Sequence, residues 1–207
     1  MKVLIFGATG TIGRELVTQG LEKGHSVTAF ARDPSKLAIS HASLEILEGD
    51  VMDSVAVDRA VADHDAVLIA LGAGSKGQVR STGTHNIIQA MQKSGTRRLV
   101  CLSTLGVGDS RGNLNFLWKY VMFGMLLRAA FADHVSQEDH VMRSGLDWTI
   151  VRPAAYTDGE RTGDYRHGFP ATEKGLKLKI SRADVADFVL TLLADDSYIR
   201  KTPGVSY

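Results

Sequence analysis

The sequence predicts an α/β fold: a doubly wound parallel sheet with helices on both faces, in one domain spanning residues 1–207. Short apolar segments alternate with helical patterns along the chain, which is typical of βαβ units. Most of these segments are continuously apolar, as expected for strands that are buried on both faces. No repeat, low-complexity run or linker divides the chain, and its length suits a single domain.

The elements are predicted in the following order. Strands are expected at 3–6, 26–30, 44–47, 66–70, 99–103 and 148–151, and helices at 12–23, 55–61, 77–94, about 115–144 (as a broken helix) and 182–194. Gly24, Gly95 and Gly145 each follow a helical pattern, as capping glycines do. Ser181 precedes the last helix as a predicted N-cap, with the acidic Asp184 in the first turn.

The first strand runs directly into Gly7-Ala-Thr-Gly10-Thr-Ile-Gly13, and a helical pattern follows. A strand, three glycines at this spacing and a helix are typical of the dinucleotide-binding turn of Rossmann-like folds. Gly7 permits a tight turn, Gly10 leaves room for a pyrophosphate, and Gly13 lets the helix pack closely. The helix N-terminus offers free N–H groups to the phosphates. The alternative interpretation is a glycine-rich turn with a purely structural role.

The end of the second strand indicates which dinucleotide is bound. NAD-binding proteins place an Asp or Glu there, about 20 residues past the glycines, to bind the ribose 2′-hydroxyl. Here Arg32 comes first, and a guanidinium recognises a 2′-phosphate by charge and paired hydrogen bonds. We therefore expect NADPH rather than NADH. Asp33 argues for NADH unless its role is to cap the turn before Pro34.

Three later strand ends complete the predicted site. Asp50 can accept a hydrogen bond from the adenine amino group while Val51 packs on the ring; the alternative is a turn with an Asp cap on the helix that starts near Ser54. Small residues in segment 71–74 let the chain pass close to the cofactor ribose. Ser103 ends the fifth strand, where its hydroxyl would face the nicotinamide and the reacting substrate.

These motifs resemble those of the atypical short-chain dehydrogenases/reductases in the NAD(P)H-binding, NmrA-like group, and most closely the biliverdin-IXβ reductase/flavin reductase branch. The resemblance covers essentially the whole chain and rests on IFGATGTIG at 5–13, ARD at 31–33, GDV at 49–51, CLS at 101–103, ADH at 132–134, SGLDWTIVRP at 144–153, TDGERTGDY at 157–165 and ISRADVADFVL at 180–190. It implies that NADPH is bound by Gly7, Thr9, Gly10, Thr11, Ile12, Arg32, Asp50, Val51, Leu71 and Gly72, with Pro153 and Ala154 beside the nicotinamide and Ser103 as the active-site serine.

Two departures from the family pattern matter. The Tyr-x-x-x-Lys pair of ordinary short-chain dehydrogenases is absent, because Tyr120 is followed by Gly124 and Tyr156 by Glu160. We therefore do not expect alcohol oxidation by a tyrosine base. The histidine that the biliverdin reductase branch carries just after the proline is replaced by alanines. We expect an NADPH-dependent reductase acting on a planar conjugated acceptor of the flavin or bilin class, with Ser103 orienting the acceptor. The alternative is a redox sensor that binds NADP(H) without catalysis.

The charges balance at 24 basic and 23 acidic residues, which argues against a general binder of nucleic acid or membrane surfaces. Segment 114–131 is strongly apolar, but Lys119 and Arg128 interrupt it. We expect it to be a helix packed on the sheet, walling a substrate pocket or a subunit contact, rather than a membrane span. The protein is expected to be a monomer or a weak homodimer.

The single cysteine, Cys101, lies in a predicted strand, so we expect a buried, inert thiol in a reducing compartment. Glycines interrupt the apolar start of the chain at once, so we expect no signal peptide and a cytoplasmic location. No metal site is expected. Loops at about 155–180 are expected to cover the substrate site. Arg111, Arg161 and Arg166 are candidates for contacting a phosphate or carboxylate of the substrate.

Overall fold

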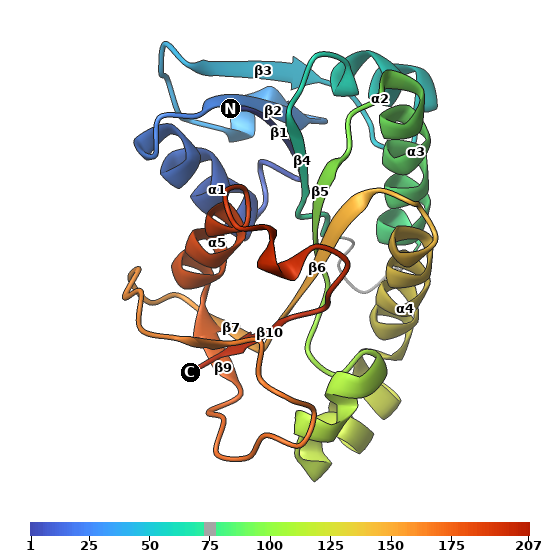
Figure 1. The fold of residues 1–207 in the computed structure, drawn as a ribbon, viewed down its shortest axis with the longest axis vertical. Helices are drawn as coiled ribbons and strands as arrows, with labels where there is room; N and C mark the ends of the chain where they lie inside the picture. The colour runs from blue at the N-terminus through green and yellow to red at the C-terminus, as the bar shows by residue number, and fades with distance from the viewer. Residues whose placement is uncertain (73–77) are drawn as a thin grey trace.

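The computed structural model describes residues 1–72 and 78–207. Strands and helices alternate through the first six strands (Figure 1): β1 (Lys2–Phe6), α1 (Thr11–Glu22), β2 (Ser26–Ala31), η1 (Pro34–Lys36), β3 (Leu44–Glu48), α2 (Ser54–Val61), β4 (Ala66–Ile69), α3 (Val79–Ser94), β5 (Arg98–Leu102), η2 (Gly108–Asn113), η3 (Leu117–Leu126), α4 (Arg128–Met142) and β6 (Asp147–Pro153). The C-terminal part adds β7 (Ala155–Thr157), β8 (Arg166–His167), β9 (Lys179–Ser181), α5 (Arg182–Thr191), η4 (Asp196–Tyr198) and β10 (Gly204–Ser206).

The main sheet has the strand order β3-β2-β1-β4-β5-β6-β10-β8. All pairs are parallel except β10 with β8, so the first six strands form the predicted doubly wound sheet with its reversal between β1 and β4. Helices α1 and α5 cover one face, and α2, α3 and α4 cover the other (Figure 1). The predicted fold class is confirmed. Ligands of such sheets bind at the carboxyl ends of the strands, where the order reverses.

Each face of the sheet carries its own apolar core. Leu16, Val17 and Val189 belong to the core beneath α1 and α5, while Ile87 and Met91 belong to the core beneath α3. The central strands β1, β4 and β5 are apolar apart from the first residues of β1 and β5 and are buried on both faces, as the sequence predicted, whereas the edge strand β3 is only partly buried. Ser181 caps α5, since its hydroxyl accepts from the Asp184 N–H at 2.9 Å. This predicted N-cap is therefore confirmed.

The segment expected to be all loop, 155–180, contains part of the fold. Strands β7 and β9 pair in parallel as a separate two-stranded sheet, and β8 joins the main sheet through β10. These strands have two or three residues each, which is too short for the sequence pattern to distinguish them from loops. The described part of α3 begins at Val79, and the predictions at Gly74 and Gly77 lie outside the described residues.

The apolar segment 114–131 is helical and walls a cavity through Leu114, Trp118, Phe123 and Leu127, as expected, but it does not pack on the sheet. It forms the π-helix η3, with no fully buried residue, and α4 starts after the break at Leu127. Figure 1 shows this helix in yellow-green, beyond the carboxyl ends of β5 and β6. Trp118 and Phe123 pack partly against the core, while Met125 and Leu126 are about 70% exposed. Within the described residues, no helix combines the length and the apolar character that crossing a bilayer requires.

Candidate active site

The glycine turn has the geometry that a dinucleotide requires. Gly7 has φ +83°, and a Cβ there would lie 2.3 Å from the Ala70 carbonyl oxygen. A Cβ at Gly13 would lie 2.1 Å from the carbonyl oxygen of Gly7, so these two positions need glycine for packing. Gly10 differs, because its Cβ would meet only the Gly7 oxygen, at 3.2 Å, and would otherwise stand in the groove. Gly10 is also the N-cap of α1, so no capping side chain competes for the first N–H groups of the helix.

A groove of about 220 Å³ begins at this turn and runs across the ends of β1, β2 and β3. Arg32 lines it. The neighbouring Asp33 carboxylate accepts from the Ser35 N–H at 3.2 Å and from the Ser35 hydroxyl, and it pairs with Lys36 at 3.4 Å. These bonds lower the pKa of Asp33, the Ser35 hydroxyl contributing most. Asp33 therefore caps the η1 turn, whereas the Arg32 guanidinium at the end of β2 has no ion-pair partner among residues 1–72 and 78–207.

The far wall of the groove is formed by Asp50 and Val51. The Asp50 carboxylate accepts from the Met52 N–H at 3.0 Å, and the cap of α2 is Asp53, which accepts from the Val55 N–H at 2.9 Å. The alternative interpretation, a turn with an Asp cap on the helix, is therefore what the structure shows, with Asp50 in the turn and Asp53 as the cap. Val51 is 6% exposed and packs against Gly83, where a Cβ would come within 2.9 Å of it.

Two further cavities continue from the groove. A junction cavity of about 150 Å³ shares Gly10, Leu71 and Gly72 with the groove, and an acceptor cavity of about 360 Å³ shares Ser103 with the junction. All thirteen residues predicted for the site line one of these three spaces: Gly7, Thr9, Gly10, Arg32, Asp50, Val51, Leu71 and Gly72 the groove, Thr11 and Ile12 the junction cavity, and Ser103, Pro153 and Ala154 the acceptor cavity. The spaces form one path from Arg32 to Ser103.

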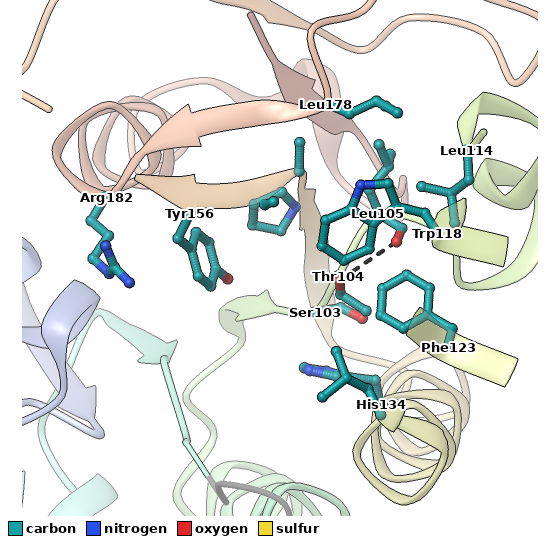
Figure 2. A pocket seen from close by; sticks show the side chains of 14 residues that line it. Ser103, Thr104, Leu105, Leu114, Trp118, Phe123, His134, Tyr156, Leu178 and Arg182 are labelled. Atoms are coloured by element: carbon teal, nitrogen blue, oxygen red, sulfur yellow. Dashed lines mark hydrogen bonds between the residues drawn. The ribbon is translucent and has the colours of Figure 1, made fainter. Parts of the chain in front are cut away.

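The acceptor cavity lies at the carboxyl ends of β5 and β6 and has mostly apolar walls. Figure 2 shows Trp118 and Phe123 on one side and Tyr156 with Arg182 on the other, with Ser103 and His134 between them. The Trp118 and Phe123 rings also contact each other, with centroids 5.6 Å apart. Such a space, walled by aromatic rings with a few polar groups, suits a flat apolar molecule.

Ser103 follows β5 and is 1% exposed. Its N–H donates to the Val151 carbonyl at 2.8 Å, which fixes the backbone at this position. Its hydroxyl oxygen is buried and has no hydrogen-bond partner among the described residues. A buried hydroxyl without a partner is uncommon and costs stability, so it marks a group kept for a ligand.

His134 on α4 contributes a neutral imidazole to the same space. Burial lowers the pKa of His134 to about 4, and the charge of Arg80 acts in the same direction. Gln137 orients the ring: its amide nitrogen donates to Thr84, so its oxygen faces His134 Nδ1 at 3.2 Å and accepts the proton there. The Nε2 atom therefore carries no proton at neutral pH and acts as an acceptor.

Arg182 connects the dinucleotide turn with the acceptor cavity. Its Nε donates to the Thr11 hydroxyl at 3.1 Å, its Nη1 pairs with Asp158, and its guanidinium carbon lies 5.6 Å from the centroid of the Tyr156 ring. Thr11 and Arg182 are 171 residues apart, so no local pattern in the sequence points to this contact. Tyr156, Arg182, Arg80 and His134 also line the site, and the sequence analysis named none of them as a site residue.

The candidate arginines predicted to meet substrate lie elsewhere. Arg161 pairs with Glu22 at 3.3 Å and Arg166 with Glu173 at 2.7 Å, and neither they nor Arg111 line the three spaces. Among the described residues of segment 155–180, Ala155, Tyr156 and Leu178 line the acceptor cavity, so its two ends cover the site. The middle of the segment is attached to α5 instead.

Comparison with known proteins identifies the family. A family model described as NAD(P)H-binding matches residues 7–196. The chain belongs to this NAD(P)H-binding family. An uncharacterised chloroplastic protein of Arabidopsis thaliana is 30% identical over 177 residues, which make up 79% of this chain. The chain spans 62% of that relative's length.

Solved structures share the fold of this family member. A short-chain dehydrogenase/reductase from Veillonella parvula, in complex with NADP, matches with a TM-score of 0.86 at 20% identity, covering 100% of this chain and 94% of that one. ChuY, an anaerobilin reductase from Escherichia coli O157:H7, matches with a TM-score of 0.80 at 23% identity, covering 99% and 96%. At these identities the likeness establishes a common architecture.

Proposed function

We propose that this protein is an NADPH-dependent reductase that transfers hydride to a planar conjugated acceptor such as a flavin or a biliverdin. The observation that carries the proposal is the single path of cavities from Arg32 to Ser103. The groove at one end is lined by the charged Arg32, and the acceptor cavity at the other end has aromatic walls and the Ser103 hydroxyl, which has no hydrogen-bond partner among the described residues. The NADP bound by the Veillonella parvula neighbour and the reductase activity named for ChuY agree with this assignment.

The residues divide the task between cofactor and acceptor. Arg32 binds the 2′-phosphate, since Asp33 is committed to Ser35 and Lys36. When bound, NADPH supplies the hydride at C4 of its nicotinamide. Pro153 and Ala154 hold the nicotinamide at the entrance of the acceptor cavity, and Ser103 donates a hydrogen bond that orients the acceptor. The wall formed by η3 excludes water from the reacting groups.

The second candidate is a redox sensor that binds NADP(H) without turnover. It is favoured by the missing Tyr-x-x-x-Lys pair and by the lining of the acceptor cavity, in which the described residues include no lysine beside Tyr156. A sensor and a reductase would bind the cofactor alike. They differ in whether hydride leaves it.

The test is to mix the purified protein with NADPH and, separately, FMN, riboflavin and biliverdin, and to follow the loss of NADPH absorbance. The proposal expects turnover with at least one acceptor. Ser103→Ala should bind NADPH as the wild type does and turn over more slowly, because only the orientation of the acceptor changes. Tight NADPH binding with no turnover of any acceptor would favour the sensor. Full turnover by Ser103→Ala with every acceptor would remove the role given to the hydroxyl.

A further inference from the structure

Arg80 is the one arginine of the junction cavity, and its backbone is held in place by α4. It lies in the first turn of α3, where the Asp133 carboxylate accepts from the Arg80 N–H at 3.2 Å and the Ser81 N–H at 3.0 Å. Both oxygens of Asp133 are thus used by the helix N-terminus. The Arg80 guanidinium comes only to 3.6 Å from the same carboxylate, which is beyond hydrogen-bond distance.

The guanidinium is buried with donors to spare. The side chain of Arg80 is 13% exposed, and its Nε and Nη1 atoms have no hydrogen-bond partner among the described residues. A guanidinium has five N–H donors and no acceptor, so only an acceptor, best of all an anion, can satisfy it. The Asp133 carboxylate, 3.6 Å from Nη1, balances the charge but leaves Nε and Nη1 without hydrogen-bond partners among the described residues, so these donors remain available to an acceptor on a ligand.

A second unpartnered donor lines the same cavity. The Ser103 hydroxyl and the Arg80 guanidinium both line the junction cavity, and both lack partners among the described residues. The other polar side chains that line this cavity carry no charge. His134 is neutral, with Nδ1–H committed to Gln137, the Thr11 hydroxyl accepts from Arg182, and the Tyr156 hydroxyl is a neutral donor.

We propose that Arg80 and Ser103 together form an oxyanion-binding site for the carbonyl oxygen of the acceptor. This inference rests on the proposed reductase function and narrows its substrates to conjugated carbonyl compounds, such as enones and quinones. The C4–H bond of NADPH breaks with its electron pair, and a C–H bond forms at the electrophilic carbon of the acceptor. The conjugated π electrons move to the carbonyl oxygen, which becomes an enolate, while the cofactor becomes NADP⁺. With a quinone, loss of a proton from the carbon that received the hydride then restores the aromatic ring. Water later supplies the proton.

The charge that develops on this oxygen explains why an arginine stands there. Hydrogen-bond donors placed where charge develops in the transition state lower the barrier, and one such donor is worth about 10²–10³-fold in rate. A neutral His134 cannot supply this charge at neutral pH, whereas a guanidinium remains charged throughout. Arg80 is accordingly a catalytic residue in this proposal, and Asp133 is its positioning residue.

The experiment compares the wild type with Arg80→Met and Arg80→Lys, and with Arg161→Met as a control at an exposed arginine already paired with Glu22. The first readout is binding of para-nitrophenol to the NADP⁺-loaded protein, because its ionised form is coloured. The wild type and Arg161→Met should lower the pKa of the bound phenol relative to Arg80→Met, with about a tenfold larger ratio of ionised to neutral phenol at the same pH. Arg80→Lys keeps the charge, so the pKa of the phenol bound to it should lie between the values for the wild type and Arg80→Met. Equal ionisation in all four proteins would overturn the proposal.

The second readout is steady-state reduction of a neutral quinone and of a carboxylated one. Arg80→Met should lower kcat for both by about 10²-fold, with the Kd of NADPH unchanged. If Arg80→Met instead raised KM for the carboxylated quinone alone, Arg80 would bind the carboxylate of the substrate and not the oxygen on which charge develops. This result would contradict the oxyanion site. A weaker Kd for NADPH would assign Arg80 to the cofactor and also contradict it. A wild type that binds NADPH but reduces nothing refutes the proposed function, and the phenol readout still decides the anion site.

Discussion

The dinucleotide groove and the acceptor cavity are built in different ways. The groove is made by backbone at the ends of β1 to β4, where glycines bring the chain close to the ligand and Arg32 adds charge. The acceptor cavity is made by side chains from η3, α4, β6 and the segments around 155 and 178. The comparison teaches that the groove depends on local backbone geometry, whereas the acceptor cavity depends on contacts between segments that are distant in the sequence. In the proposed reductase, selection of the acceptor would therefore require these segments to be held together.

Two buried ionic clusters hold the acceptor half. Arg152 on β6 binds Glu138 on α4 through two hydrogen bonds of 3.0 and 2.7 Å, with side-chain exposures of 4% and 1%. Asp184 on α5 accepts from the N–H groups of Thr162 and Gly163 and from the Thr162 and Tyr207 hydroxyls. The first cluster fixes the helix that carries His134. The second ties the middle of segment 155–180 to α5.

The largest effect is expected from breaking the first cluster. Glu138→Ala leaves the Arg152 guanidinium buried without its main partner, which should lower the free energy of unfolding by about 3–5 kcal/mol. Urea denaturation measures the loss. Asp109→Asn is the matched control, because Asp109 pairs with the same arginine but is 74% exposed, so it should cost less than about 1 kcal/mol. An equal loss of unfolding free energy in Glu138→Ala and Asp109→Asn would contradict the distinction between the buried and the exposed partner of Arg152.

The next prediction concerns the groove. Arg32→Ala should weaken NADPH by about 10-fold to 100-fold, the value of charge-assisted hydrogen bonds to a phosphate, and should leave NADH nearly unchanged. The protein should unfold at the same urea concentration as the wild type, because Arg32 is exposed. The Kd values of both dinucleotides, measured by fluorescence, check this. Equal weakening of NADPH and NADH would remove Arg32 from the 2′-phosphate.

A smaller effect is expected at Asp184. Burial acts to raise the pKa of Asp184, but hydrogen bonds from Tyr207, Gly163 and Thr162 outweigh it and hold the pKa below its usual range. A group with a lowered folded pKa stabilises the protein above its unfolded pKa and loses that contribution as the pH falls. Asp184→Asn should cost about 1–3 kcal/mol near neutral pH and less in acid.

Urea denaturation at several pH values measures this difference between Asp184→Asn and the wild type. Asp164→Asn, at an exposed neighbour on the same segment, serves as the control and should match the wild type at every pH. A cost at Asp184 that stays constant as the pH falls would show that the carboxylate charge is not what matters.

The smallest effect is expected at His134. Because burial lowers the pKa of His134 to about 4, the ring stays neutral in the working range, and kcat/KM should show no inflection near pH 6.5 from this residue. The folded protein binds fewer protons than the unfolded chain between pH 6.5 and about 4, so the contribution of neutral His134 is lost as the pH falls through that window. Urea denaturation at several pH values should show that His134→Gln abolishes this loss of stability in acid. A bell-shaped pH profile of kcat/KM in the wild type that disappears in His134→Gln would show that the ring titrates in the working range and would contradict the prediction.

The sequence predicted structural features correctly where those features depend on residues that are close together in the chain. Glycine spacing, continuous apolar strands and the position of Arg32 predicted the fold and the residues of the groove, because each depends on neighbours in the chain. Tyr156, Arg182 and Arg80 could not be assigned in this way. Their roles depend on packing between segments that are distant in the sequence, such as the contact of Arg182 with Thr11. The placement of η3 could not be predicted either, because its apolar pattern fits a helix packed on the sheet as well as a helix beside it that walls a cavity.

A crystal structure with NADP⁺ tests the central claim most directly, since the claim is that one path joins the two halves. The account predicts the 2′-phosphate within hydrogen-bond distance of Arg32 and the nicotinamide C4 facing the cavity walled by Trp118 and Phe123, beside Ser103. A 2′-phosphate away from Arg32, or a nicotinamide turned out of the acceptor cavity, would contradict it.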